Sequence, residues 1–202
     1  MSFNAQDSFA IQSRLLDRPV PHNSITRLPA VRGYARAHGA DVQEGAWPDF
    51  TRGPAPASGE PATRFSVGFN NPGGASPSAY TAEFRYNAAT GLYERFLGGV
   101  LHVDAANGRP VATENVVIMV APVIVTNIIE DILGSRSLDY QVQGEGAAYF
   151  QRDGLRWQGC WRRPGAFEPV TFWDAGGHPF PLGDGQVWIA VAGTDTPLRW
   201  QP

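Results

Sequence analysis

The most apolar stretch of the chain reads Val116-Val117-Ile118-Met119-Val120-Ala121-Pro122-Val123-Ile124-Val125. It spans about ten residues, half of the roughly 20 that a membrane-crossing helix needs, and a proline interrupts it. Both alternating sets of side chains are apolar, which predicts a central strand that is buried on both faces. We therefore expect burial of five side chains along it: Val116, Ile118, Val120, Val123 and Val125.

Alternating apolar and polar residues around this stretch predict further strands. The clearest cases are residues 64–69 and 80–86. Others are expected at 92–96, 111–123, 138–142, 147–152, 155–162, 170–174 and 187–192. Turn sequences such as Arg152-Asp153-Gly154 separate neighbouring segments, so hairpins and antiparallel pairing are favoured. Residues 127–133 fit either a short helix or a loop.

The N-terminal region predicts a helix. Ser24 or Thr26 supplies a cap, Pro29 falls in the first turn and Gly39 follows as a stop. Apolar side chains recur between them at helical spacing, at Leu28, Val31, Tyr34 and Ala35. We expect an α+β chain that is predominantly antiparallel sheet with an N-terminal helix. Its parts are a helical segment (1–44), a Pro/Gly-rich linker (45–62) and a β-rich domain (63–202).

Composition excludes several classes of function. The chain has 202 residues, with 19 acidic against 16 basic side chains, and every basic side chain is arginine. We therefore expect no nucleic-acid partner, no Schiff-base lysine and no lysine-dependent phosphate loop. The four histidines form no HExxH motif, and Cys160 is the one cysteine, so no metal or cofactor is expected. The first residues lack a secretory signal, and we expect a soluble chain without a membrane span.

His102-Val103-Asp104 is the first candidate site. Side chains two apart on a strand share a face, so Asp104 can orient the imidazole of His102 for acid–base chemistry. Alternatively, Asp104 binds backbone amides at a turn ahead of Asn107-Gly108. His22, in Pro21-His22-Asn23, is a further catalytic candidate. Its structural alternative is a helix junction capped by Asn23 or Ser24.

Arg95 is the candidate ligand-binding residue beside this pair. Gly98-Gly99 permits a tight reversal that brings Arg95 alongside His102 and Asp104. Tyr93 shares a strand face with Arg95, and Glu114 or Asn115 arrives from the next strand. An arginine there suits an anionic ligand. The alternative is a structural ion pair, between Arg95 and Asp104 or with a nearby glutamate.

Aromatic residues gather in the last third of the chain, at Trp157, Trp161, Trp173 and Trp188. Tryptophan in strands is either core or a platform for sugars and peptides, and we retain Trp161 as a binding candidate. Cys160 lies between Gly159 and Trp161 in a predicted strand, which favours a buried structural thiol.

Several strings in series resemble the YerB-like bacterial lipoproteins, a family of unknown function. They are Pro21-His22-Asn23, Tyr93-Glu94-Arg95, His102-Val103-Asp104, Glu114 to Ile118, Gly144 to Phe150, Gly159 to Arg163, Phe172 to Gly177 and Gly185 to Ile189. The resemblance runs from about residue 9 to 193. It implies an extracytoplasmic, membrane-anchored parent with a lipid-bearing cysteine and an N-terminal α/β half. This chain has neither signal nor lipobox, which indicates a fragment or a shortened form.

Two functions follow as hypotheses. The first is a non-catalytic envelope binding or scaffolding module, whose partners are cell-wall or envelope fragments. The second is a hydrolase- or lyase-type enzyme on anionic cell-wall material, which uses His102, Asp104, Arg95 and His22.

Overall fold

The computed structural model describes residues 12–17, 23–39, 49–69, 80–130, 132 and 134–202. The chain divides into two compact units, residues 1–47 and residues 48–202. Within the described ranges the strands are mostly antiparallel and a single short helix is present. That helix is too short and too polar to cross a membrane.

The first unit contains a small strand pair and the helix. Strands β1 (Gln12–Arg14) and β2 (Ser24–Thr26) pair antiparallel, and α2 runs over Leu28–Ala37. The predicted helix is therefore present, with Pro29 in its first turn.

The predicted helix cap is wrong. Arg27 occupies the N-cap position and makes no side-chain capping bond, because Ser24 and Thr26 belong to β2. The Asn23 side chain does not cap the helix either. Its amide nitrogen donates to the Leu15 carbonyl at 3.0 Å, and its side-chain oxygen accepts from Arg14 at 2.9 Å. His22 lies outside the described residues.

The second unit is built on two sheets. Sheet I has the order β14-β13-β12-β9-β15, with β3 also paired to β13. Its strands are β3 (Glu60–Pro61), β9 (Asn115–Ala121), β12 (Gly144–Arg152), β13 (Leu155–Arg163), β14 (Thr171–Asp174) and β15 (Val187–Gly193). The β15–β9 pair is parallel, whereas the other strand pairs of sheet I are antiparallel.

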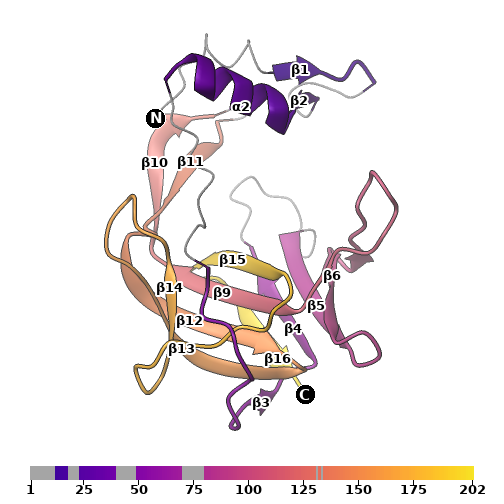
Figure 1. The fold of residues 1–202 in the computed structure, drawn as a ribbon, viewed down its shortest axis with the longest axis vertical. Coiled ribbons are helices and arrows are strands. Elements are labelled where there is room, and N and C mark those ends of the chain that lie inside the picture. The colour runs from indigo at the N-terminus through magenta and orange to yellow at the C-terminus, as the bar shows by residue number, and fades with distance from the viewer. Residues whose placement is uncertain (1–11, 18–22, 40–48, 70–79, 131, 133) are drawn as a thin grey trace. The chain divides into compact units, whose positions relative to one another are not determined.

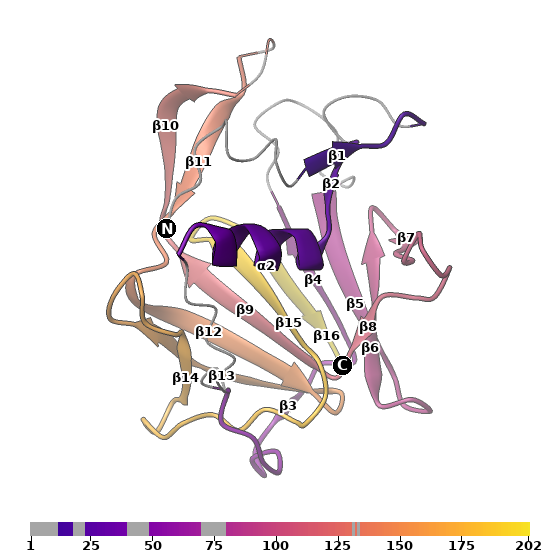
Figure 2. The same cartoon turned by 45° about the horizontal axis from the view of Figure 1, so that its top comes forward.

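Sheet II has the order β16-β4-β5-β6-β7, with β8 also paired to β6. Its strands are β4 (Arg64–Gly68), β5 (Thr81–Asn87), β6 (Leu92–Leu97), β7 (Val100–Leu101), β8 (Ala112–Thr113) and β16 (Leu198–Gln201). All its pairs are antiparallel. Figure 2 separates the two sheets, with β9, β12 and β13 in one and β4, β5 and β6 in the other.

Strand β9 has apolar side chains on both faces, and each face packs into a hydrophobic core. Val116 and Ile118 pack into a core shared with sheet II, together with Phe65, Phe84 and Tyr93. Val117 and Met119 face the other way, into a second core. The described part of the predicted linker helps to cover that second core, because Phe50 and Ala55 pack against it and β3 extends sheet I.

The apolar stretch does not continue as one buried strand. Val116 and Ile118 are buried as predicted, and Val120 is partly buried. Pro122 then ends β9, and β10 (Val123–Ile129) pairs with β11 (Arg136–Tyr140) in a separate hairpin that extends away from both sheets (Figure 1). Val123 is partly buried there, but Val125 is 58% exposed, so the prediction is wrong for Val125.

Candidate functional site

Arg95, on β6, lies beside His102, which directly follows β7. Gly98 and Gly99 have φ values of 57° and 82°, which only glycine adopts freely, and they form the tight reversal between β6 and β7. The His102 backbone N–H donates to the Arg95 carbonyl at 2.9 Å. The side chains also meet, with Arg95 Nη1 at 2.6 Å from His102 Nδ1. The reversal thus brings together the two residues that the sequence placed there.

The Arg95 guanidinium stacks on the indole of Trp188. Its Cζ atom lies 4.8 Å from the ring centre. Arg95 is paired across the sheet with Phe84, whose ring is buried in the core between the sheets. Paired residues share a face of the sheet, so the Arg95 side chain lies on the face that carries this core. Trp188 comes from β15 of sheet I. The site therefore lies where β15, the edge strand of sheet I, meets β6 of sheet II.

Arg95 has no carboxylate partner among the described residues. Its Nε atom is buried and makes no hydrogen bond there. Desolvation lowers the pKa of Arg95 from its ordinary value. By contrast, Arg85 on the neighbouring strand stacks on Phe96, with its Cζ atom 3.8 Å from the ring centre, and it is ion-paired with Glu83. Arg95 is a partly buried cation whose charge this part of the structure leaves uncompensated.

His102 accepts a hydrogen bond from Arg95, which fixes its tautomer. A guanidinium only donates, so Nδ1 of His102 must be the acceptor. A neutral imidazole whose Nδ1 accepts carries its hydrogen on Nε2. His102 therefore presents an N–H donor beside the guanidinium.

Asp104 serves the turn that follows rather than His102. Its carboxylate oxygens accept from the Ala106 backbone N–H at 2.8 Å and from the Asn107 side chain at 2.9 Å. Its carbonyl accepts from the Gly108 N–H at 2.7 Å, which closes the turn. No contact with Arg95 or His102 is recorded for this carboxylate within the described ranges. The turn alternative accounts for both of its oxygens.

Tyr93 and Trp161, both predicted ligand-binding residues, are completely buried. The Tyr93 hydroxyl donates to the Ala62 carbonyl at 3.0 Å, and burial raises the pKa of Tyr93 well above its usual value. The Trp161 indole N–H donates to the Val120 carbonyl at 2.9 Å. Neither side chain has a surface with which to contact a ligand in this conformation.

Glu114 and Asn115 bind the loop that precedes β15. Glu114 accepts from the Gly185 N–H at 2.8 Å, and buried Asn115 accepts from the Gly183 N–H at 2.7 Å. A Cβ atom at Gly183 would overlap the Glu114 carboxylate. These two residues hold the loop, and through it Trp188, in place.

Sequence reasoning missed two arginines that act on the same loop. Arg52 donates to the carbonyls of Gly183 and Gly185. Arg152 donates to the carbonyl of Gly53 at 2.8 Å and to that of Pro181 at 3.1 Å. No sequence motif marks such contacts, because each joins segments far apart in the chain.

No group of three or more metal-ligating side chains occurs in the described ranges. Cys160, expected to be buried, is partly buried in β13 and is a free thiol.

Comparison with known proteins places the chain in a family. Residues 75–189, more than half of the chain, match the C-terminal domain of the family described as "Protein of unknown function (DUF3048)". A relative from Bacillus subtilis (strain 168), named "Putative lipoprotein YerB", is 26% identical over 174 residues. Those residues are 85% of this chain and 48% of the relative, so the chain spans about half of the relative's length.

A crystal structure of the YerB protein from Bacillus subtilis has the same fold. Its TM-score is 0.70 at 21% identity, and the match covers 94% of this chain and 59% of that one. The family match, the relative and the shared fold agree with the resemblance seen in the sequence. The chain belongs to the DUF3048 family and contains its C-terminal domain.

Proposed function

We propose that this chain is a binding module of a cell-envelope protein and that it takes an anionic ligand at Arg95, His102 and Trp188. The observation that carries the proposal is the Arg95 guanidinium, which is partly buried, stacked on an indole and without a described carboxylate partner. Burying a cation costs free energy unless it is paired, and an anionic ligand supplies the missing charge.

The neighbouring groups suit a carboxylate. His102 Nε2–H and the Arg95 N–H groups that are not bound to His102 are donors for the acceptor oxygens of a carboxylate, and Trp188 gives a flat apolar wall. A cell-wall peptide or a uronic acid carries such a carboxylate. The envelope location rests on the relative's name as a lipoprotein, which we extend to this chain as part of the proposal.

The alternative function is an enzyme on the same anionic material, with His102 as acid–base catalyst. It requires a group that orients the imidazole, and Asp104 was the residue expected to do so. Both Asp104 oxygens accept hydrogen bonds within their own turn. The geometry therefore supports binding better than catalysis by this pair.

Calorimetric titration of the chain with an acidic peptidoglycan stem peptide and with an oligouronate tests the proposal. We expect saturable binding of at least one of them, weakened by added salt, and its loss in Arg95→Gln. Arg85→Gln is the matched control, since Arg85 also stacks on an aromatic ring but already has Glu83 as its partner. Absence of heat with both ligands, or equal loss in the two variants, would refute the proposal.

A further inference from the structure

Strand β15 is an edge of sheet I among the described residues. It pairs with β9 from Val187 to Gly193 without a bulge, and no described strand pairs with its other side (Figure 2). Its sequence, Val-Trp-Ile-Ala-Val-Ala-Gly, contains no charged residue and no proline. Proteins commonly protect an edge strand with charges, proline or a bulge, because an unprotected edge recruits further strands. Strand β15 has none of these protections.

Hydrogen bonds at the two ends of β15 show which backbone groups face the open edge. The Gln186 carbonyl accepts the N–H of Asn115 at 3.1 Å, so Gln186 points toward β9. The Gly193 N–H donates to the Thr196 hydroxyl of the following turn at 2.9 Å, and not to β9. The backbone groups of successive strand residues alternate between the two sides of a strand. The outward-pointing residues of β15 are therefore Val187, Ile189 and Val191.

The outward N–H and C=O groups of these three residues make no hydrogen bond within the described ranges. They extend over a strand length of about 13 Å. The opposite edge strand of sheet I, β14, is different. There the Asp174 N–H donates to the His178 carbonyl at 2.8 Å, and the Phe180 N–H donates to the Phe172 carbonyl at 2.9 Å. Sheet I is thus closed at β14 and open at β15.

The side chains of β15 divide between two faces. Val187, Ile189 and Val191 pack against the core on one face of sheet I. Trp188 lies on the other face, where the Arg95 guanidinium stacks on its indole. A residue added opposite Trp188 has its side chain on that same face, because directly opposed residues share a face of the sheet. A carboxylate on that residue would face the Arg95 guanidinium.

We propose that β15 takes up an extended peptide segment of a protein partner as an additional antiparallel strand, with an acidic residue opposite Trp188. This inference rests on the proposed function, because it names the anion at Arg95 as this acidic side chain. The flanking peptide residues lie opposite Val187 and Ile189 and exchange both backbone hydrogen bonds with them. Their side chains lie on the apolar face of β15, so the recognised pattern is apolar–acidic–apolar.

Other occupants satisfy only part of this site. A second copy of the chain could pair through its own β15, but this strand contains no acidic residue, so both Arg95 charges would stay uncompensated. A carbohydrate carboxylate neutralises Arg95 but has no regular series of N–H and C=O groups for the open edge. An acidic peptide strand satisfies the charge and the edge together.

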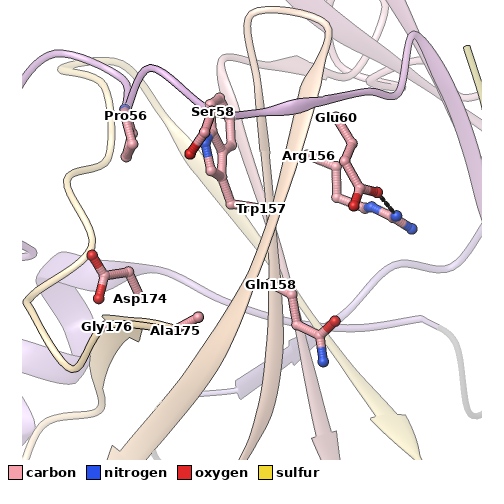
Figure 3. A pocket seen from close by; sticks show the side chains of 9 residues that line it. All are labelled: Pro56, Ser58, Glu60, Arg156, Trp157, Gln158, Asp174, Ala175 and Gly176. Carbon is pink, nitrogen blue, oxygen red and sulfur yellow. Dashed lines mark hydrogen bonds and ion pairs between the residues drawn. The ribbon is translucent and has the colours of Figure 1, made fainter.

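The pocket at the other side of sheet I does not combine these two features. It has a volume of about 340 Å³, and its lining includes Ser58, Trp157 and Asp174 (Figure 3). Arg156 also lines it, but this arginine is already ion-paired with Glu60, as the dashed line in Figure 3 marks. The unpaired arginine beside an open strand edge is therefore a feature of β15.

Hydrogen exchange of the ¹⁵N-labelled chain, measured by NMR, tests the proposal. The probe is acetyl-Thr-Val-Glu-Val-Thr-amide, whose single charge is the glutamate, and its control carries glutamine at that position. We expect the outward amides of Val187, Ile189 and Val191 to exchange fast in the free chain and about tenfold more slowly with saturating glutamate peptide. The amides of Trp188 and Ala190, which point toward β9, are the internal reference.

N-methylated peptides test the strand pairing without any change in the protein. N-methylation of either valine removes a hydrogen bond to β15, so we expect about fivefold to tenfold weaker binding. N-methylation of the glutamate is the matched control, because its N–H points away from β15 in the antiparallel arrangement and binding should be unchanged.

Arginine variants test the pairing of charges. Arg95→Gln should bind the glutamate and glutamine peptides equally, whereas Arg85→Gln should keep the preference for glutamate. If the glutamate peptide binds Arg95→Gln as tightly as the parent chain, the proposed function and this inference are both refuted.

Failure of this inference alone has a different signature. If the stem peptide or the oligouronate binds through Arg95 while the glutamate peptide leaves the outward amides unchanged, the anion site stands and the added strand is wrong. Slow exchange of these amides in the free chain, or equal weakening by N-methylation of valine and glutamate, would also overturn the added strand.

Discussion

Replacing Arg95 with methionine separates a ligand-binding arginine from a structural one. Methionine keeps much of the length and apolar stem of arginine but carries no charge. If Arg95 were half of a buried ion pair, its removal would leave a buried charge without a partner and cost about 3–5 kcal/mol. Arg95 has no described carboxylate partner, so that penalty does not apply.

The expected magnitude follows from the contacts that Arg95 does make. The stacking on Trp188 contributes about 0.5–1 kcal/mol. The hydrogen bond to His102 contributes about 0.5–1.5 kcal/mol. The substitution also removes the free-energy cost of keeping a partly desolvated charge in the folded state, and this raises the stability of the variant. We therefore expect Arg95→Met to change the free energy of unfolding by less than about 1 kcal/mol.

Urea denaturation followed by tryptophan fluorescence measures this change. Arg152→Met is the positive control, because Arg152 is 8% exposed and holds two backbone carbonyls and Asp153. We expect that variant to lose about 2–5 kcal/mol. A loss above about 3 kcal/mol for Arg95→Met would mean that Arg95 is structural, and the reasoning above would be refuted.

Three further predictions concern the core and the loop before β15. Ile118→Ala should cost about 2–5 kcal/mol in chemical denaturation because Ile118 is fully buried; a loss below about 1 kcal/mol would contradict its place in the core. The raised pKa of Tyr93 gives stability that is complete below the unfolded pKa of about 10 and is lost as pH rises toward the folded pKa. The unsubstituted chain should therefore lose about 2 kcal/mol more than Tyr93→Phe between pH 9 and 11.5, whereas parallel curves would exclude this linkage. Gly183→Ala should lower stability by about 1–3 kcal/mol, since its Cβ overlaps the Glu114 carboxylate; an unchanged Tm would show that the loop can move.

Local patterns predicted much of the β-rich unit because its pairings are mostly between neighbours in sequence. The turn at Asp153 and Gly154, with φ values of 55° and 74°, joins β12 to β13 as its sequence indicates. The same reasoning placed Arg95 near His102 through Gly98-Gly99. In each case a short turn fixes the register, and the register fixes which side chains meet.

Such local patterns could not predict contacts between segments that are distant in the chain. The parallel pairing of β15 with β9 brings Trp188 to Arg95, and no turn sequence predicts a pairing between strands so far apart in the chain. The exposed half of the apolar stretch was missed because alternation does not tell a core strand from the β10–β11 hairpin once Pro122 has ended β9.

The most direct test of the central claim observes the Arg95 guanidinium itself during titration. A ¹H–¹⁵N spectrum of arginine Nε groups, assigned with Arg95→Gln and Arg85→Gln, is recorded as the acidic stem peptide or the oligouronate is added. We predict that the Arg95 Nε–H resonance shifts and saturates with at least one ligand, because the charge and stacking of the guanidinium change, while that of Arg85 stays in place. An Arg95 resonance that neither ligand moves, or that moves together with Arg85, would contradict an anion site at Arg95.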